Sequence, residues 1–416
     1  MIPANCHTYT LANGLRVIHE QTDSPVVYCG YVMRVGTRHE QPAESGMAHF
    51  IEHLTFKGTH RRRAWQISNG LERVGGELNA YTTKQETVYC ATVLRPDFAR
   101  AVDLLTDIVF HSTYPQAEID REVEVICDEI DSFKDSPSEL IFDEFESLVF
   151  EGCDLGRDIL GEADRLRQYR TADALRFTRA HYRPDNAVLY IYGNVDFRRA
   201  VRQLERLMAT AEALPSPHAP VPTACTLALP PARTVYRDRG THQAHVLLGC
   251  PTYGGRHPRR FALLLLNNIL GGPGMNARLN MLMRERAGLV YTVESNYATY
   301  VDVGLWTVYF GCDADDVDRC LRMVRRELQR MIDQPLTARQ LAAAKKQFIG
   351  QIGISREARE SYAISLGKTY AHYGTWRDLD ALAQAVSALT SEELQAVAAE
   401  VFAADGLSLL VYTTSR

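Results

Sequence analysis

A proline-rich segment divides this chain of 416 residues into two halves. Between Leu214 and Pro231, 6 of the 17 prolines fall within 18 residues. Proline fixes φ and removes a backbone donor, so this segment cannot form a helix and is expected to be a semi-stiff connector. A domain usually has roughly 100–200 residues. We therefore expect an N-terminal domain at 1–212, a linker at 213–232 and a C-terminal domain at 233–416.

The two halves have the same predicted order of elements: two strands, two helices, two strands, long helices and a last strand. The strands expected in the first half are a hairpin within Thr8–His19, then Val26–Val35, Gly76–Thr82, Glu86–Val93 and Ala187–Tyr192. Its expected helices are Ser45–Phe56, Ala64–Val74, Pro96–Phe110, Pro115–Phe133 and Ser136–Phe150. This order predicts a fold of the α+β class, in which helices cover a mixed or antiparallel sheet.

The second half repeats this pattern. Its expected strands are Ala244–Cys250, Val290–Tyr300, Gly304–Cys312 and Ser408–Tyr412. Its expected helices are Pro258–Leu270, Ala277–Arg286, Asp315–Ile332, Thr337–Ile352 and Glu357–Tyr373. We therefore predict two homologous α+β domains that arose by duplication.

The strongest local signal is the run His49-Phe50-Ile51-Glu52-His53. Histidines at i and i+4 lie one turn apart on one helical face, so both imidazoles can reach a single ion. Glu52 shares that face, and the apolar residues lie opposite. Imidazole suits zinc, and a catalytic zinc site keeps one position open for water. The alternative is a helix with two histidines on its polar face, because a short motif can arise by chance.

A catalytic zinc site usually has three protein ligands, and the acidic segment Glu118–Asp131 is the obvious source of the third. Its apolar stripe consists of Ile119, Val123, Ile126, Ile130 and Phe133. Glu122 and Glu129 lie two helical turns apart at the border of that stripe. On spacing alone either carboxylate could be the ligand, and a solvated acidic face is the alternative for both.

With these residues the chain resembles the pitrilysin-like peptidases, zinc enzymes with an inverted motif (inverzincins) that include mitochondrial processing peptidase and insulin-degrading enzyme. In that family a glutamate ligand follows the motif after about 75 residues, and Glu129 follows His53 by 76. A second glutamate seven residues earlier, at the position of Glu122, also belongs to the family pattern. The similar segments are Gly46–Thr59, Asn79–Thr82, His181–Asn186 and Gly193-Asn194.

The resemblance implies a zinc metalloendopeptidase with one Zn2+ per chain. His49, His53 and Glu129 are the expected ligands. Glu52 is expected to take a proton from the water that attacks the peptide bond and to return it to the leaving amine. Glu122 is expected to lie behind the ligands, where it would orient a ligand histidine or hold local charge.

The resemblance also indicates where substrate binds. The strand Glu77–Thr82 is expected at a sheet edge, where an extended peptide would pair with it. The residues expected to contact substrate there are Asn79, Ala80 and Tyr81. In the second half, Arg284 and Tyr291 match an arginine and a tyrosine that contact substrate in the family. An arginine can hold a peptide carbonyl, and a tyrosine hydroxyl can stabilise the oxyanion.

The resemblance further implies that the two domains form one half of a clamshell. Relatives of this length pair as dimers, so we expect an active homodimer, with a heterodimer as the alternative. A closed chamber would restrict substrates to unfolded or short peptides. A processing peptidase for targeting sequences is one rival function. A non-catalytic scaffold subunit of the same fold is another, but such subunits usually have a degraded metal motif.

Composition limits the remaining functions. Hydrophobic residues make up 46% of the chain and charged residues 23%, which is ordinary for a globular protein. The net charge of −5 and the lack of a basic patch argue against nucleic acid as a partner. The nine cysteines form no Cys-x-x-Cys pair, which favours a reducing compartment. No apolar stretch approaches the roughly 20 residues of a membrane span. We therefore expect a cytoplasmic protein without a membrane partner.

Overall fold

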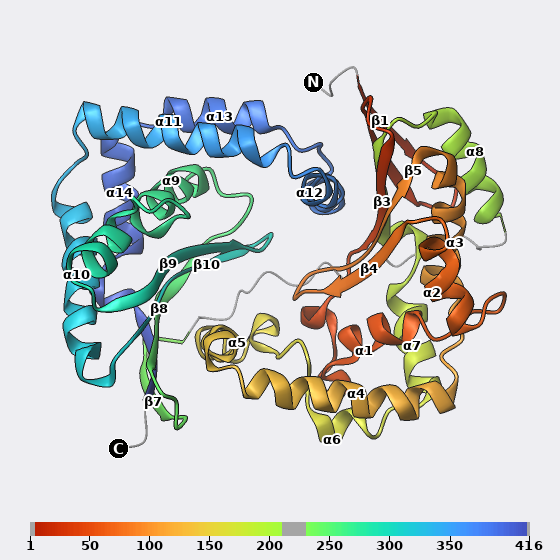
Figure 1. Cartoon of the computed structure of the whole chain (residues 1–416), viewed down its shortest axis with the longest axis horizontal. Coiled ribbons are helices and arrows are strands. Elements are labelled where there is room, and N and C mark those ends of the chain that lie inside the picture. Colours follow the sequence, from red (N-terminus) through yellow and green to blue (C-terminus); the bar gives the residue numbers. More distant parts are fainter. Residues whose placement is uncertain (1–4, 210–229, 414–416) are drawn as a thin grey trace. The chain divides into compact units, whose positions relative to one another are not determined.

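The computed structural model describes residues 5–209 and 230–413. These residues form two compact units (Figure 1). The first comprises the described parts of Met1–Ile130, Arg157–Thr223 and Arg356–Arg377. The second comprises the described parts of Asp131–Gly156, Ala224–Ser355 and Asp378–Arg416. Most of the predicted linker, 213–232, lies outside the described residues.

The first unit is built on a six-stranded sheet in the order β1-β2-β6-β3-β5-β4. The strands are β1 (Cys6–Thr10), β2 (Arg16–Gln21), β3 (Val26–Met33), β4 (Glu77–Thr82), β5 (Thr87–Leu94) and β6 (Ala187–Gly193). The neighbours β2 and β6 run parallel, and the other described neighbours run antiparallel. The central strand β6 is buried along its whole length, which explains its continuous apolar sequence.

Helices cover both faces of this sheet. They are α1 (Met47–Thr55), α2 (Ala64–Glu72), α3 (Phe98–His111), α4 (Gln116–Lys134, which ends in the second unit), α6 (Ala163–Leu166), α7 (Thr171–His181), α8 (Phe197–Leu207) and α12 (Arg359–Tyr373). On β6, Leu189 and Ile191 point into the main core, which includes residues of α1, α3 and α4. Tyr190 lies between them and points to the other face, because side chains alternate along a strand. That face is covered by α12 (Figure 1).

The contact between α12 and the sheet is close. A Cβ on Gly367 would lie 2.5 Å from Cδ1 of Tyr190. Real Cβ atoms do not come that near another carbon atom, so only glycine lets the helix pack at this depth. A segment from the C-terminal half of the sequence is thus an integral part of the first unit.

The second unit is built on a five-stranded sheet in the order β7-β11-β8-β10-β9. Its strands are β7 (Thr234–Asp238), β8 (Ala244–Tyr253), β9 (Val290–Thr299), β10 (Val303–Cys312) and β11 (Ser408–Thr413). Its helices are α5 (Pro137–Val149), α9 (Arg260–Gly271), the π-helix η6 (Asn280–Arg286), α10 (Val317–Asp333), α11 (Ala338–Ser355), α13 (Leu379–Ala388) and α14 (Ser391–Val401). One pair, β7 and β11, is parallel.

The two sheets share one topology. Five strands of the first sheet, β2-β6-β3-β5-β4, match β7-β11-β8-β10-β9 of the second in both order and direction. The prediction of an α+β chain with two helix-covered mixed sheets is confirmed. None of the described helices is both long and apolar enough to cross a membrane.

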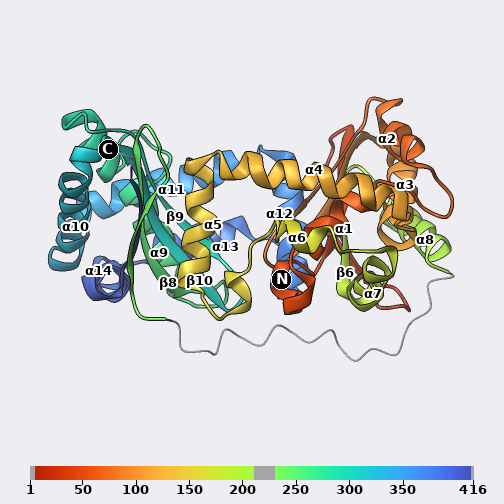
Figure 2. The ribbon, with the colours of Figure 1, turned by 90° about the horizontal axis from the view of Figure 1, so that it is seen from below.

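Two helices are exchanged between the halves of the sequence. The helix α5 comes from the first half, yet Ile141 and Phe145 pack against Leu247 and Leu410 of the second sheet. In that unit α5 lies on one face of the sheet, and α10 and α14 lie on the other (Figure 2). The helix α12 makes the reverse exchange. The predicted continuous domains, 1–212 and 233–416, do not include this exchange, because an apolar helical stripe does not specify which sheet will cover it.

The predicted long elements match the observed ones to within a few residues. Several elements have no counterpart in the prediction, namely β7, α6, α7, α8, α13 and α14. The predicted helix Ala277–Arg286 is largely a π-helix over Asn280–Arg286. A π-helix is rare, and a few residues of apolar pattern cannot separate it from an α-helix.

Candidate metal centre

The motif helix α1 begins at a glycine that the fold requires. Gly46 is the N-cap and has φ of 77°. A Cβ there would also meet the carbonyl oxygen of Leu160 at 2.6 Å. The buried carboxylate of Glu40 accepts hydrogen bonds from the backbone N–H groups of Gly46 (3.0 Å) and Ala48 (2.8 Å). Glu40 therefore satisfies donors at the N-terminus of α1, which a side chain of the N-cap would otherwise do.

One face of α1 is anchored in the core, as predicted. Its apolar residues Met47, Ala48, Phe50, Ile51 and Leu54 are fully buried. The opposite face presents His49, Glu52 and His53, of which the first two are also buried. The two imidazole centroids are 4.6 Å apart. Packing of the apolar stripe thus fixes the direction in which the three polar side chains point.

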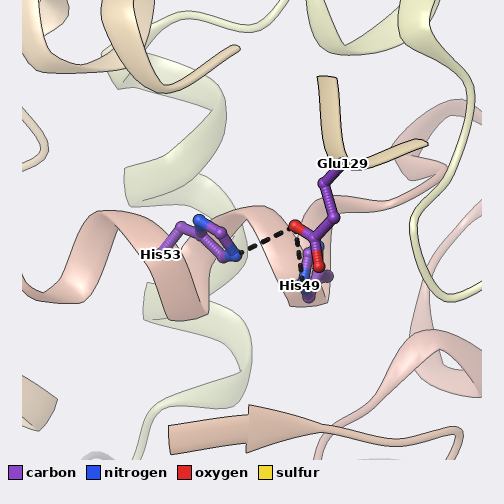
Figure 3. A group of neighbouring side chains, drawn as sticks. All are labelled: His49, His53 and Glu129. Atoms are coloured by element: carbon purple, nitrogen blue, oxygen red, sulfur yellow. Dashed lines mark ion pairs between the residues drawn. The ribbon is translucent and has the colours of Figure 1, made fainter. Parts of the chain in front are cut away.

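The helix α4 brings a carboxylate to these imidazoles (Figure 3). Oε2 of Glu129 lies 3.9 Å from Nε2 of His49 and 3.5 Å from Nε2 of His53. One ligand atom from each residue falls within 4.8 Å of the others. The apolar stripe of α4, which includes Ile126 and Ile130, is buried and holds the helix in place. The structure therefore brings together the three residues predicted as metal ligands.

This donor set fits zinc. Tetrahedral bonds of about 2.0–2.2 Å place two ligand atoms about 3.4 Å apart, close to the separations from Glu129. Burial, and next the neighbouring His53, lower the pKa of His49 to about 3. The imidazole of His49 is therefore neutral near pH 7, as a metal ligand must be. Nδ1 of His49 is buried without a hydrogen-bond partner in the described part of the chain, so packing alone orients this ring.

The second glutamate of α4 lies behind His53. Oε1 of Glu122 is 3.0 Å from Nδ1 of His53, and its Oε2 is 2.6 Å from Nζ of Lys57. Burial alone would raise the pKa of Glu122, but the bonds to His53 and Lys57 outweigh it and hold this pKa below its usual value. Glu122 is therefore a carboxylate that accepts a hydrogen bond from the Nδ1–H group of His53, which leaves Nε2 of His53 to face Glu129.

The remaining motif residue, Glu52, is held from β4. The hydroxyl of Thr82 donates a 2.8 Å hydrogen bond to Oε2 of Glu52. Burial raises the pKa of Glu52, and the Thr82 hydrogen bond and the charge of His53 only partly oppose this. The net shift is upward. Glu52 is thus a buried carboxylate on the same helical face as His49 and His53. Its pKa is raised toward neutral pH, and such a pKa suits a general base.

Comparison with known proteins agrees with this geometry. Residues 16–163 match the family model "Insulinase (Peptidase family M16)", and residues 170–348 match "Peptidase M16 inactive domain". A zinc protease of Streptomyces coelicolor is 35% identical over 94% of this chain and 86% of its own length. The zinc protease YmxG of Bacillus subtilis is 31% identical over 95% of this chain and 96% of its own length. The chain belongs to the M16 peptidase family. It is a zinc protease.

Solved structures show the same fold as this M16 protease. A protease from Helicobacter pylori superposes with a TM-score of 0.92 over 99% of this chain and 100% of its own, at 21% identity. A structure titled as a peptidase M16 inactive domain from Pseudomonas fluorescens gives a TM-score of 0.87 over 99% of both chains, at 20% identity. The two-unit architecture is therefore shared well beyond the range of sequence similarity.

The strand predicted to bind substrate, β4, lies at the edge of the first sheet, as expected. It pairs with β5 on one side, from Glu77 opposite Thr92 to Thr82 opposite Thr87. Asn79 is exposed, and its side chain accepts a hydrogen bond from the backbone N–H of Ala80. The outer edge of β4 has no partner strand among the described residues, and the Ala80 N–H is occupied by the Asn79 side chain.

Arg284 and Tyr291 lie side by side in the second unit of the protease. The guanidinium carbon of Arg284 is 5.6 Å from the ring centroid of Tyr291. Tyr291 is 80% exposed, the most exposed of the large apolar side chains in the described residues. Both line a cavity of about 730 Å³ between η6, β9 and the end of α11.

Two residues of the site were not singled out from the sequence. Thr82 and Lys57 contact Glu52 and Glu122 respectively. Both fall inside the segments that resemble the family, Asn79–Thr82 and Gly46–Thr59. The resemblance therefore marked their positions, but their roles depend on contacts with residues far along the chain.

Proposed function

We propose that this M16 protease is an endopeptidase that cleaves unfolded or short peptides with one zinc ion per chain. The observation that carries the proposal is the convergence of His49, His53 and Glu129 beside Glu52. These three residues would hold the ion. Bound zinc would act as a Lewis acid that activates water and polarises the scissile carbonyl.

Glu52 is proposed as the general base and then the general acid. It accepts a proton from the attacking water and delivers it to the leaving amine. Its burial supports this role, because a carboxylate whose pKa is raised is a stronger base and takes a proton from water more readily than an exposed one. The hydroxyl of Thr82 bonds to Oε2 of Glu52 and fixes the orientation of the carboxylate. The other oxygen, Oε1, takes no part in this hydrogen bond.

The substrate is proposed to bind as an added strand along the outer edge of β4. Asn79, Ala80 and Tyr81 would contact it there. Backbone hydrogen bonds would supply affinity without strong sequence preference. This mode needs an extended peptide, so folded proteins would be poor substrates. A processing peptidase for targeting sequences is the narrower alternative, and it would show a marked preference among extended peptides.

Arg284 and Tyr291 are proposed to contact the same substrate, with Arg284 on a peptide carbonyl and Tyr291 on the developing oxyanion. Their proximity in the second unit supports a joint role. We further propose that the active form is a homodimer in which these residues reach the zinc site of the partner. A heterodimer with a related chain is the alternative.

Zinc analysis joined to a cleavage assay tests the metal centre. Wild type is expected to hold about one zinc per chain and to cleave a quenched fluorescent peptide. His49→Ala, His53→Ala and Glu129→Gln should lose zinc and cleavage together, and Glu52→Gln should keep zinc and lose cleavage. Glu118→Gln, at a partly exposed position of α4 where the side chain pairs with Arg121, is the control. A wild type with neither zinc nor cleavage would favour a scaffold role.

Complementation tests the dimer. The Glu52→Gln chain is mixed with a chain that carries Arg284→Ala and Tyr291→Phe, after each is found inactive alone. If the second unit serves the partner's zinc site, each mixed dimer contains one intact site and cleavage returns. If cleavage stays absent although co-purification of differently tagged chains shows that the subunits exchange, the residues act within their own chain or not at all.

A further inference from the structure

Two basic residues of α12 hold a buried carboxylate in the turn that follows β4. Nζ of Lys368 lies 2.7 Å from Oε1 of Glu86, and Nε2 of His372 lies 2.7 Å from Oε2 of Glu86. Lys368 and His372 are four residues apart, so they project from the same side of the helix. Only 4% of the Glu86 side chain is exposed. Both of its oxygens are thus occupied by α12, and the carboxylate has little freedom to move.

The turn itself is tightly bonded. The side-chain hydroxyl of Thr83 accepts hydrogen bonds from the backbone N–H groups of Gln85 (3.2 Å) and Glu86 (3.1 Å). The backbone N–H of Thr83 donates a hydrogen bond to the carbonyl oxygen of Glu86 (2.8 Å). Arg38 donates to the side chain of Gln85 at 3.2 Å. The segment from Thr83 to Glu86 therefore behaves as one body, and the position of Glu86 sets the position of Thr83.

This turn begins directly after the residue that holds the general base. Thr82 is the last residue of β4, and its hydroxyl bonds to Glu52 at 2.8 Å. Nζ of Lys368 also lies 5.9 Å from the ring centroid of Tyr81, the preceding residue of β4. A continuous series of contacts runs from α12 through Glu86 and the turn to Thr82.

We propose that Glu86, Lys368 and His372 are positioning residues for peptide hydrolysis. They hold the turn so that Thr82 keeps Glu52 aimed at the reaction centre and β4 keeps its edge in register for the substrate. The inference rests on the proposed roles of Glu52 and β4. It assigns a function to the helix exchange: α12 comes from the C-terminal half of the sequence and supports the base on α1 from the far face of the sheet.

The expected effect is on turnover. A misplacement of a reacting group by about 1 Å can cost on the order of 100-fold in rate. Loss of one of two anchors would shift the turn by less, so Glu86→Gln should lower kcat about tenfold. None of the three residues lies among the proposed zinc ligands, so zinc content should stay at the wild-type value. KM should change less than kcat, because the main group displaced would be the general base Glu52.

The experiment measures kcat, KM, zinc content and melting temperature for Glu86→Gln, Thr82→Val and the double variant. Lys368→Met and Lys368→Arg form a second pair, in which arginine keeps the positive charge. Arg359→Met is the control, because Arg359 lies on the same helix and pairs only weakly with Glu357, at 3.9 Å. Rates are compared per zinc-loaded, folded molecule.

The inference requires three results. Glu86→Gln lowers kcat with zinc retained, Lys368→Arg recovers activity that Lys368→Met loses, and Glu86→Gln does not lower kcat further in the Thr82→Val background. It is overturned if the variants only lower the melting temperature and leave kcat unchanged. Independent, multiplicative losses in the double variant also overturn it, because the path through Thr82 would then be wrong. A wild type without zinc or cleavage is a different result, which refutes the proposed function itself.

Discussion

The carboxylate behind His53 offers the sharpest test of the metal centre. Oε1 of Glu122 accepts a hydrogen bond from Nδ1 of His53 at 3.0 Å, and Oε2 forms an ion pair with Nζ of Lys57 at 2.6 Å. Only 8% of the Glu122 side chain is exposed. In Glu122→Gln the amide oxygen can still accept the Nδ1 hydrogen bond, so the ring keeps its direction. The negative charge is lost, and the ammonium of Lys57 is left without its partner.

The size of the effect follows from these contacts. A hydrogen bond to a charged group contributes about 1.5–3 kcal/mol, which corresponds to about a 10- to 100-fold change in an equilibrium constant. We therefore expect Glu122→Gln to weaken zinc binding by about 10- to 100-fold, the range for partners of ligand histidines. Adding Lys57→Met should recover part of the loss, because it removes the uncompensated positive charge beside the cation.

Zinc affinity can be measured by competition with a chromophoric chelator. Glu118→Gln is the matched control on the same helix, because Glu118 pairs only with the exposed Arg121 among the described residues and should leave affinity unchanged. Of the three substitutions Glu118→Gln, Glu122→Gln and Glu129→Gln, the last should weaken zinc binding most. Equal affinity for wild type and Glu122→Gln would refute the reasoning. If Glu122→Gln abolished binding and Glu129→Gln preserved it, the two glutamates would exchange roles.

Three further predictions concern catalysis and stability. Tyr291→Phe should lower kcat with zinc content unchanged, whereas Tyr236→Phe, at another exposed tyrosine, should have no effect in the peptide assay. Gly46→Ala should lower the melting temperature more than Gly75→Ala: both glycines have positive φ, but a Cβ at Gly75 meets nothing within 4 Å. Although burial raises the pKa of Glu86, its two basic partners lower it to about 2. Stability from this group is then complete above the ordinary pKa near 4.5 and is lost as pH falls through about 2, on the order of 3 kcal/mol. Thermal unfolding between pH 5 and pH 3 should therefore depend less on pH in Glu86→Gln than in wild type.

Much of the candidate site was predictable because it depends on local periodicity. Two histidines and a glutamate within five residues lie on one helical face, and that relation holds wherever the helix packs. The spacing of Glu122 and Glu129 likewise placed both on one side of α4. Spacing left the choice between them open. In the fold, Glu129 faces both Nε2 atoms and Glu122 faces Nδ1 of His53.

The helix exchange was not predictable from these patterns. An apolar stripe indicates that one side of a helix must be buried, but it does not indicate against which sheet. The two sheets of this chain have the same strand order in five of their strands. The hydrophobic pattern by itself therefore does not choose between the two sheets for α5 and α12. Close packing separated them: the glycine at 367 fits over Tyr190, and Phe145 fits over Leu247 and Leu410.

The sequence by itself determined many of the longer elements, the family and the motif, since each is written in spacings of a few residues or in whole segments that resemble known proteins. Apart from Glu122, only the tertiary structure decided which groups contact that motif and its surroundings. Thr82 lies 30 residues from Glu52, and His372 lies 286 residues from Glu86. Contacts over such separations form only when packing brings two elements together, and no local pattern of polar and apolar residues records them.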